Sequence, residues 1–226
     1  MRMLALVGAL LLVIVAFFHG YVEKQHWFSI EKITLKGELT YLTEDELMTA
    51  YDSLLGRSLL QISLAEVFEI TNTPPWVEST SIRRVWPNEL RIYVVEHTPL
   101  AFWRTGQIIT ASGRVIAPSV RPDLPLPHLS GPVGAEQVAL EQFGLVSQVL
   151  SSSGLRVQSL TLEARGSWTV AFFNGLLVRL GREEILERLQ RFIAVYKTDL
   201  SGRIDKIISV DARYPHGIAV EWLVEP

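Results

Sequence analysis

The first 22 residues constrain the fold more than any other part of this chain. From Met3 to Phe18 there is no charged side chain, and the apolar character continues to Val22. A helix rises about 1.5 Å per residue, so about 20 such residues give a helix about 30 Å long, which matches the thickness of a bilayer core. The sequence therefore predicts one transmembrane helix at residues 3–22, preceded by a tail of residues 1–2.

A cleaved secretory signal is the alternative interpretation of this segment. Such a signal has a shorter apolar core and ends at a site of small residues. Here the run ends in Ala16-Phe17-Phe18-His19-Gly20, which places bulky side chains where a signal peptidase reads small ones. An uncleaved anchor is therefore favoured. Arg2 is the charged side chain before the helix, and the positive-inside rule places the N-terminus in the cytoplasm.

Composition excludes several classes of function. The chain has 226 residues and a formal net charge of −3, which gives no electrostatic basis for binding nucleic acid. It contains no cysteine, and this excludes disulfides, thiol catalysis and cysteine-ligated zinc. The sequence has neither a glycine-rich phosphate loop nor a nucleophile elbow, and its histidines have no partner at metal-ligand spacing. We therefore expect no catalytic residue, metal, cofactor or small-molecule substrate.

The segment after the anchor has the pattern of a small α+β domain. Thr43–Glu46 and Ser63–Glu66 each match a capping box, in which the first side chain accepts from a backbone amide and the last reaches back. Apolar residues alternate at Leu90, Ile92 and Val94, which predicts a strand with one buried face. The predicted elements are a strand near 30–35, helices at 43–55 and 63–73, and strands at 79–86 and 90–96.

Residues 98–226 are predicted to form a mixed β domain with flanking helices. Asn174-Gly175 is a strong hairpin signal because both residues tolerate positive φ. Residues 118–132 contain five prolines and are predicted to be a rigid surface connection. Helices are predicted at 135–150 and 183–196, and strands at 100–104, 107–111, 114–117, 160–164, 168–173, 176–180, 204–210 and 218–224.

The final predicted strand has no successor in the chain, which favours a place at the edge of a sheet. An edge strand has unpaired backbone groups and invites another chain to pair with it. The flanking segment offers Arg213, Tyr214 and Trp222, which are residue types enriched at interface hot spots. The sequence thus predicts a site for β-augmentation. An ordinary terminal strand is the alternative.

Short motifs follow one another along nearly the whole chain. They are Ile33-Thr34-Leu35-Lys36-Gly37, Pro75-Trp76-Val77, Ile82-Arg83-Arg84-Val85-Trp86-Pro87, Leu129-Ser130-Gly131-Pro132, Asn174-Gly175, Leu180-Gly181-Arg182, Val210-Asp211-Ala212-Arg213-Tyr214 and Gly217-Ile218-Ala219-Val220-Glu221-Trp222. Each motif is weakly specific, but their order behind a single anchor is specific. In this order they resemble the FtsQ/DivIB family of bacterial cell-division proteins.

The resemblance implies a POTRA domain at 28–97 and a β domain at 98–226, both periplasmic, behind an anchor in the inner membrane. It implies a scaffold of the divisome, concentrated at the division septum and without enzyme activity. The implied partners are the small bitopic proteins FtsB and FtsL and other divisome components. By motif position, the resemblance implies that Arg165, Tyr214, Gly217 and Trp222 are functional, and Arg213 joins this partner site from the edge-strand argument.

The chain departs from the family pattern at three places. Its cytoplasmic tail is shorter than is usual in the family, and Ala212 replaces a larger apolar residue. Pro215-His216 replaces a more polar turn. Proline has no N–H, so Pro215 removes a donor where pairing of an added strand would begin.

Two other functions are alternatives. A signal-anchored periplasmic hydrolase would need a triad assembled from dispersed residues such as Ser167, His128 and Asp211. A POTRA receptor for outer-membrane secretion would need many barrel strands, and the helices predicted at 135–150 and 183–196 argue against it.

Overall fold

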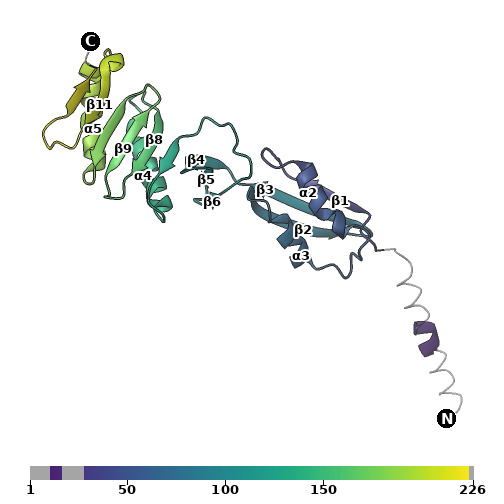
Figure 1. Cartoon of the computed structure of the whole chain (residues 1–226). Coiled ribbons are helices and arrows are strands. Elements are labelled where there is room, and N and C mark those ends of the chain that lie inside the picture. The colour runs from purple at the N-terminus through teal and green to yellow at the C-terminus, as the bar shows by residue number, and fades with distance from the viewer. Residues whose placement is uncertain (1–10, 17–27, 224–226) are drawn as a thin grey trace. The chain divides into compact units, whose positions relative to one another are not determined.

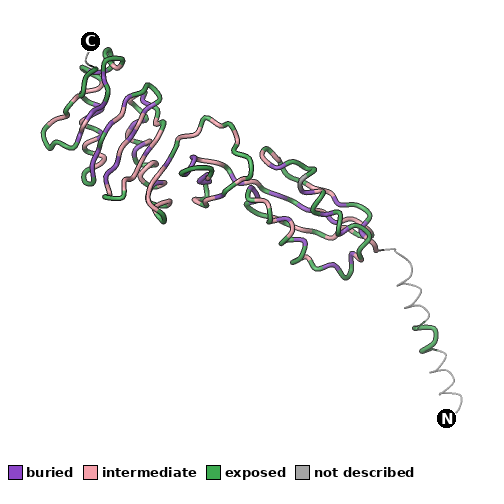
Figure 2. Tube along the Cα trace, in the orientation of Figure 1, coloured by how far each residue is buried: buried purple, intermediate pink, exposed green. Residues whose placement is uncertain are grey.

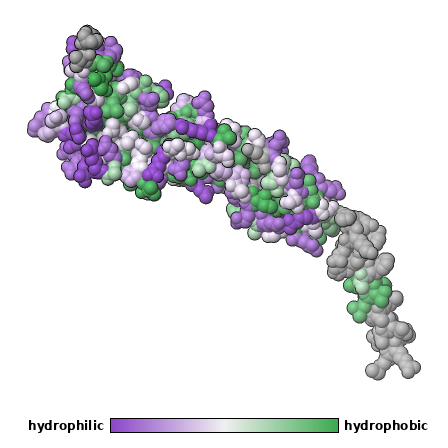
Figure 3. All heavy atoms as spheres, in the orientation of Figure 1, coloured by the Kyte–Doolittle hydropathy of each residue, from purple (hydrophilic) through white to green (hydrophobic). Residues whose placement is uncertain are grey.

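The computed structural model describes residues 11–16 and 28–223. The tail predicted at 1–2 lies outside the described residues, as does most of the predicted transmembrane helix at 3–22. Residues 11–16 of that segment are helical and exposed, and Figure 3 shows them as hydrophobic surface. Among the described residues, no helix combines the length and the hydropathy that crossing a bilayer requires. The anchor therefore stays a prediction.

Contacts divide the chain into two compact units, Met1–Glu96 and His97–Pro226. Each unit has its own buried residues, which appear as purple stretches along the strands in Figure 2. The two units are described separately below.

The first unit contains a three-stranded sheet with the order β1-β3-β2 and two helices (Figure 1). β1 is parallel to β3, and β2 is antiparallel to β3. The predicted order of strand, helix, helix, strand and strand is confirmed. The elements are β1 (Lys32–Lys36), α2 (Glu44–Tyr51), a 3₁₀ turn (Asp52–Leu54), α3 (Leu64–Thr71), β2 (Val77–Val85) and β3 (Glu89–Glu96).

The alternation predicted along β3 is confirmed, because Leu90, Ile92 and Val94 are all buried. Tyr51 closes the helical side of this core, and its buried hydroxyl donates to Thr71 Oγ1 at 2.9 Å. Thr71 in turn donates to the carbonyl of Val67 at 2.7 Å. Buried polar groups are satisfied in this way without water.

Two carboxylates organise the loops around the helices. Ser63 Oγ accepts from the amide of Glu66 at 3.4 Å, as the capping box predicts. The Glu66 carboxylate, however, does not complete the box, because it binds the Arg57 guanidinium through contacts of 2.7 and 2.9 Å. Glu96, at the end of β3, accepts from three successive backbone amides, at Thr40, Tyr41 and Leu42.

The second unit is built on a nine-stranded sheet with the order β12-β11-β10-β9-β8-β7-β4-β5-β6. Most neighbours are antiparallel, but the pairs β4–β7, β7–β8 and β10–β11 are parallel, so the sheet is mixed. Its strands are β4 (Pro99–Trp103), β5 (Gln107–Thr110), β6 (Val115–Ile116), β7 (His128–Ser130), β8 (Val157–Leu162), β9 (Trp168–Phe172), β10 (Leu177–Gly181), β11 (Ile207–Asp211) and β12 (Ala219–Trp222).

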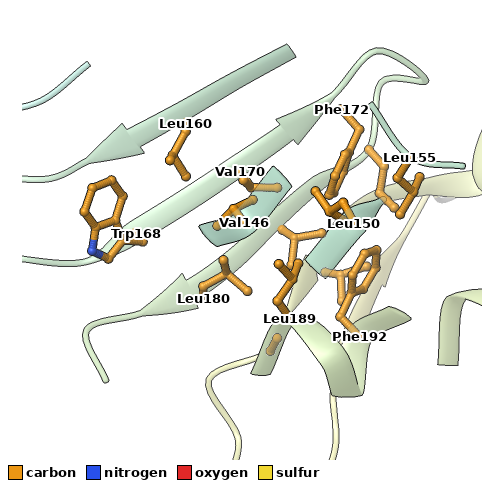
Figure 4. Close-up of a cluster of buried hydrophobic side chains, with 14 of the residues drawn as sticks. Val146, Leu150, Leu155, Leu160, Trp168, Val170, Phe172, Leu180, Leu189 and Phe192 are labelled. Atoms are coloured by element: carbon orange, nitrogen blue, oxygen red, sulfur yellow. The ribbon is translucent and has the colours of Figure 1, made fainter. Parts of the chain in front are cut away.

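Helices α4 (Glu136–Leu150) and α5 (Ile185–Val195) cover this sheet and contact each other. α4 packs on β7 and β8, and α5 packs on β10. Figure 4 shows the core that they enclose, where side chains from α4 and α5 meet those of β8, β9 and β10. Its labelled members are Val146, Leu150, Leu155, Leu160, Trp168, Val170, Phe172, Leu180, Leu189 and Phe192.

The structure differs from the predicted elements of this unit mainly at two places. β7 lies inside the segment 118–132, which the sequence predicts to be a rigid surface connection and not a strand. It is only three residues long, and it forms because β4 and β8 supply parallel partners on both sides. The strand predicted at 204–210 begins later, because Ile204–Lys206 forms a 3₁₀ turn.

Candidate functional site

β12 occupies one edge of the nine-stranded sheet, as predicted for the final strand. Within the described residues it pairs with β11 alone, antiparallel, with Val210 opposite Val220. The amide of Leu223 donates inward to the carbonyl of Lys206 at 2.7 Å. Backbone groups alternate in direction along a strand, so the amides and carbonyls of Val220 and Trp222 face the open edge.

Pro215 lies outside this edge. It belongs to the turn at 214–216 that joins β11 to β12, and β12 begins at Ala219. The missing N–H of Pro215 therefore does not interrupt the strand. Among the described residues, β12 has four residues that an added strand could pair with.

Strand directions gather four of the five predicted partner residues at one end of the sheet. Leu162 of β8 pairs with Trp168 of β9, Trp168 with Gly181 of β10, and Asp211 of β11 with Ala219 of β12. We call the sheet end marked by these residues the Arg213 end. The turns that follow or precede these residues carry Arg165, Arg213, Tyr214 and Gly217.

Arg213 is held firmly at this end. Its Nε and Nη2 bind the Asp211 carboxylate at 2.9 and 2.5 Å, and its backbone amide also donates to Asp211 Oδ1, at 3.0 Å. These hydrogen bonds lower the pKa of Asp211, and those from the Arg213 side chain have the largest effect. The stem of Arg213 crosses Gly181, where an added Cβ would lie 3.0 Å from Arg213 Cγ.

Tyr214 combines a fixed backbone with an exposed ring. Its carbonyl accepts from Arg191 Nη1 of α5 at 2.5 Å, while the residue is 56% exposed. An aromatic ring on a fixed backbone loses little conformational freedom when a partner covers it, and this is a property of interface anchors.

Arg165 lies in the turn between β8 and β9 and is the most exposed of the predicted cations. Its Nε contacts Glu163 Oε2 at 2.6 Å, and its side chain is 67% exposed. Glu163 also acts electrostatically on Arg213. Arg182 Nε approaches the neighbouring Gly166, so this sheet end presents several guanidinium groups.

Gly217 has no steric requirement for glycine in this structure. A Cβ added there would meet no heavy atom within 4 Å, and its φ lies outside the positive range that favours glycine. Of the five predicted residues, it is the one whose identity the fold of this chain does not explain.

Trp222 lies at the opposite end of β12, which we call the Trp222 end. It is 41% exposed and stands opposite Ile207. A bulge between Ile207 and Ser209 leaves Ile208 exposed, and Leu223 is exposed as well. The sequence patterns did not predict that Ile208 and Leu223 are exposed at this end. For Ile208, the sequence signal is the apolar pair Ile207-Ile208, where strict alternation would place one apolar residue.

A polar network fastens β12 to the sheet. Arg179 of β10 donates to Ser209 Oγ at 3.0 Å, and Ser209 donates to Glu221 Oε2 of β12 at 2.7 Å. Three adjacent strands are thereby linked through side chains as well as through backbone pairs. The position of the edge strand on the sheet is therefore fixed by side chains as well as by the backbone.

The residues proposed for a hydrolase take part in separate interactions. Asp211 binds Arg213, as described above. His128 Nε2 lies 3.2 Å from Arg121 Nη2, and the His128 ring lies against Phe102. Ser167 is buried, and its carbonyl accepts from the amide of Glu163. In the described part of the chain, no cluster of His, Asp or Glu is arranged to hold a metal.

Two family models match this chain. The model for the C-terminal region of the cell division protein FtsQ/DivIB matches residues 101–213, and the model for the FtsQ-type POTRA domain matches residues 28–97. The first match ends at Arg213, so β12 follows the matched residues.

Curated relatives carry the same family name over most of the chain. The cell division protein FtsQ of Shewanella oneidensis is 36% identical over 224 residues, covering 96% of this chain and 85% of that protein. FtsQ of Xanthomonas campestris pv. campestris is 31% identical over 229 residues, covering 100% of this chain and 82% of that protein. FtsQ of Coxiella burnetii is 37% identical over 150 residues, covering 66% of this chain and 61% of that protein.

Proposed function

Because this chain belongs to the FtsQ/DivIB family of cell division proteins, we propose that it is a non-enzymatic scaffold of the divisome. Residues 3–22 anchor it in the inner membrane, and the POTRA domain and the β domain lie in the periplasm. It binds the small bitopic proteins FtsB and FtsL through the open edge of β12. The single observation that carries this proposal is the edge position of β12.

Backbone pairing alone gives this site a modest affinity. Val220 and Trp222 present about four outward backbone groups, and each hydrogen bond contributes about 0.5–1.5 kcal/mol net. Side chains must supply the remainder. At the Trp222 end these are Trp222, Ile208 and Leu223, whose exposed apolar area is available to a partner.

The Arg213 end supplies specificity. Arg165, Arg213 and Tyr214 gather at the turns on this side, and guanidinium groups favour carboxylates with good geometry. We infer that the partner segment carries acidic residues near one end of its added strand and apolar residues near the other. This polarity would fix the register of pairing, because a slip by one residue turns each side chain to the opposite face.

The membrane anchor assists this binding. FtsB and FtsL, as single-pass proteins, would be confined to the same membrane. Tethering two binding partners raises the effective concentration of one at the other without any new contact. A modest edge-strand affinity is then sufficient for assembly.

Localisation tests the role in division. A fluorescent fusion of the full chain is expected to concentrate at the septum of dividing cells. An even distribution around the envelope would contradict the proposed function. Replacing residues 3–22 by another single transmembrane helix is expected to preserve the septal signal, whereas a fusion without any anchor should lose it.

A matched pair of variants at Val220 tests the edge itself. Val220→Pro removes the outward N–H, which an edge strand tolerates, while Val220→Ala trims the side chain and keeps the N–H. In a pull-down with the FtsB-like partner, Val220→Pro should bind at least about tenfold more weakly than Val220→Ala. Equal binding by two folded variants would remove β12 as the pairing edge.

Side-chain variants test the two ends separately. Tyr214→Ala and Trp222→Ala should each weaken partner binding by about tenfold or more, because hot-spot truncations cost more than about 1 kcal/mol. Circular dichroism and cooperative urea unfolding would show that each variant remains folded. Full affinity in both variants would limit the site to backbone pairing.

A further inference from the structure

Exposed apolar side chains gather at the end of the first unit where the described chain enters it. Leu55, Leu60 and Trp86 are 44%, 57% and 53% exposed. Phe28, where the described segment 28–223 begins, packs edge-on against Trp86 with ring centroids 5.6 Å apart. We call Phe28, Leu55, Leu60 and Trp86 the entry patch. The partner site in the second unit does not involve it.

Backbone hydrogen bonds hold the loop that carries the two leucines against the entering chain. The amide of Leu59 donates to the carbonyl of Phe28 at 2.6 Å, and the amide of Gly56 donates to the carbonyl of Ile30 at 2.9 Å. Leu60 and Leu55 are the immediate neighbours of these two donors. Their positions are therefore fixed relative to Phe28.

The turn between β2 and β3 holds Trp86 on the same entering segment. The amide of Glu31 donates to the carbonyl of Asn88 at 3.0 Å. The Asn88 side chain also donates to Glu31 Oε2, at 2.5 Å. Trp86 lies two residues before Asn88, so both loops of the entry patch flank the point of entry.

Chain length places this patch close to a membrane. The predicted transmembrane helix ends at Val22, and six residues further on the chain has reached Phe28. An extended chain covers at most about 3.3–3.6 Å per residue, so Phe28 lies within about 20 Å of the end of that helix. The headgroup layers on the two sides of the hydrocarbon core together add about 10–15 Å, which is within this reach.

We propose that the entry patch inserts into the headgroup layer of the bilayer and thereby holds the first unit against the membrane surface. The inference rests on the anchor of the proposed function. Trp side chains favour this layer because an apolar ring and a polar N–H meet there, and leucines gain by leaving water. The occupant is therefore a lipid surface.

Of the carboxylates near the patch, Glu31 accepts a hydrogen bond from Asn88, and two others are paired with arginines. Glu66 is paired with Arg57 at 2.7 Å, and Glu89 is paired with Arg91 at 2.9 Å. These carboxylates are compensated within the protein, so they do not oppose negatively charged headgroups as free charges would. Arg83 on β2 adds an exposed cation on the adjoining strand.

The absence of cysteine makes a direct test possible, because a single introduced thiol labels one site. Leu60→Cys and Leu55→Cys would each carry a small fluorophore in the full chain, reconstituted in phosphatidylethanolamine–phosphatidylglycerol vesicles. Val95→Cys is the matched control, an exposed apolar position of the same sheet at the far end of β3. Nitroxide-labelled lipids with the spin label near the headgroup should quench the first two labels at least about twofold more than the control.

A label at Leu12→Cys separates this proposal from the proposed anchor. Quenching at position 12 by a nitroxide deep in the acyl chains, without extra quenching at positions 55 and 60, would overturn the entry patch and leave the anchor intact. Absence of quenching at position 12 would overturn both. Shielding of position 60 from aqueous iodide without nitroxide quenching would assign the patch to a protein occupant and overturn the lipid proposal.

A second variant tests whether the patch, and not proximity alone, causes insertion. Trp86→Glu in the Leu60→Cys background places a charge in the patch at an exposed position. Quenching at position 60 should then fall to the level of the Val95→Cys control, with unchanged circular dichroism. Undiminished quenching in the folded double variant would contradict insertion of the entry patch.

Discussion

The guanidinium of Arg213 forms a bidentate ion pair with the carboxylate of Asp211, with Nε 2.9 Å from Oδ1 and Nη2 2.5 Å from Oδ2. The backbone amide of Arg213 donates to the same Oδ1. The first residues after β11 are thus fixed in backbone and in side chain before the chain reaches Tyr214. This pair defines the geometry of the Arg213 end, and its loss should affect binding more than folding.

Asp211→Asn should lower partner affinity several-fold but reduce the free energy of unfolding by only about 0.5 kcal/mol, because the Arg213 side chain is partly exposed and solvent screens the pair. Urea unfolding and a pull-down measure the two effects. Glu163→Gln, which breaks the more exposed pair with Arg165, is the matched control and should change stability less. If Asp211→Asn lost much more free energy of unfolding than free energy of binding, this assignment would be contradicted.

The same pair predicts a pH dependence at acid pH. Arg213 lowers the pKa of Asp211 in the folded protein, so the stabilisation is present above the unfolded pKa of about 3.9 and is lost as the pH falls through the lower folded value. Wild-type unfolding curves between about pH 5 and pH 2 should show this loss. In Asp211→Asn that portion of the pH dependence should be absent.

Gly181→Ala and Gly217→Ala form a second matched pair. An added Cβ at Gly181 would lie 2.5 Å from Arg188 Nη1 and 3.0 Å from Arg213 Cγ, at a φ of +83°. Gly181→Ala should therefore cost about 1–3 kcal/mol of stability and displace Arg213. Gly217→Ala meets no neighbouring atom and should leave stability within about 0.5 kcal/mol. Thermal unfolding would distinguish them, and equal midpoints would refute the steric argument.

His128 should make stability weakly dependent on pH near neutrality. Arginine cannot accept a hydrogen bond, so the contact with Arg121 requires His128 Nε2 to be the unprotonated acceptor. Desolvation, followed by the charge of Arg121, lowers the pKa of His128. The contribution of His128 to stability is therefore fully present at high pH. It declines as the pH falls below about 6.5, the pKa of histidine in the unfolded chain.

Replacement of His128 tests this dependence. His128→Gln should flatten the pH profile of the thermal midpoint between about pH 7 and pH 5, with an effect at pH 7.5 within about 0.5 kcal/mol. A His216→Gln variant, which changes an exposed histidine in the turn between β11 and β12, should keep the wild-type slope. Identical slopes in the two variants would show that another group titrates.

Glu96 should contribute strongly to the first unit. Its carboxylate accepts from three backbone amides before α2, and a glutamine would offer one oxygen where the carboxylate offers two. Glu96→Gln should cost about 1–3 kcal/mol and speed hydrogen exchange at Thr40 and Leu42. Glu69→Gln, on the exposed side of α3, should change neither quantity.

Sequence patterns predicted the parts of the fold that depend on local periodicity. The alternation along β3 and the hairpin at Asn174-Gly175 report local backbone preferences, and the structure confirms both. β7 was missed because three residues are too few to show a period and the strand depends on its two neighbours. The Glu66 carboxylate was assigned to its own helix because the sequence cannot show that Arg57 competes for it.

The candidate site was predictable only in part. The edge position predicted for the final strand is confirmed, and local composition indicated Arg213, Tyr214 and Trp222. The separation of these residues into two ends of β12 depends on strand directions, which are a property of the whole sheet. Ile208 is exposed because of a bulge in the pairing of β11 with β12. A single sequence does not show which strand β11 pairs with, so it cannot show the bulge.

The shortness of β12 also has a kinetic consequence. Association rates among related complexes vary little, so differences in affinity arise mainly from how fast partners separate. A ladder that can gain only about four backbone bonds does little to slow that separation. In the proposed complex, a few side chains at the two ends of the strand would then set its lifetime, and single substitutions could adjust that lifetime without any change of fold.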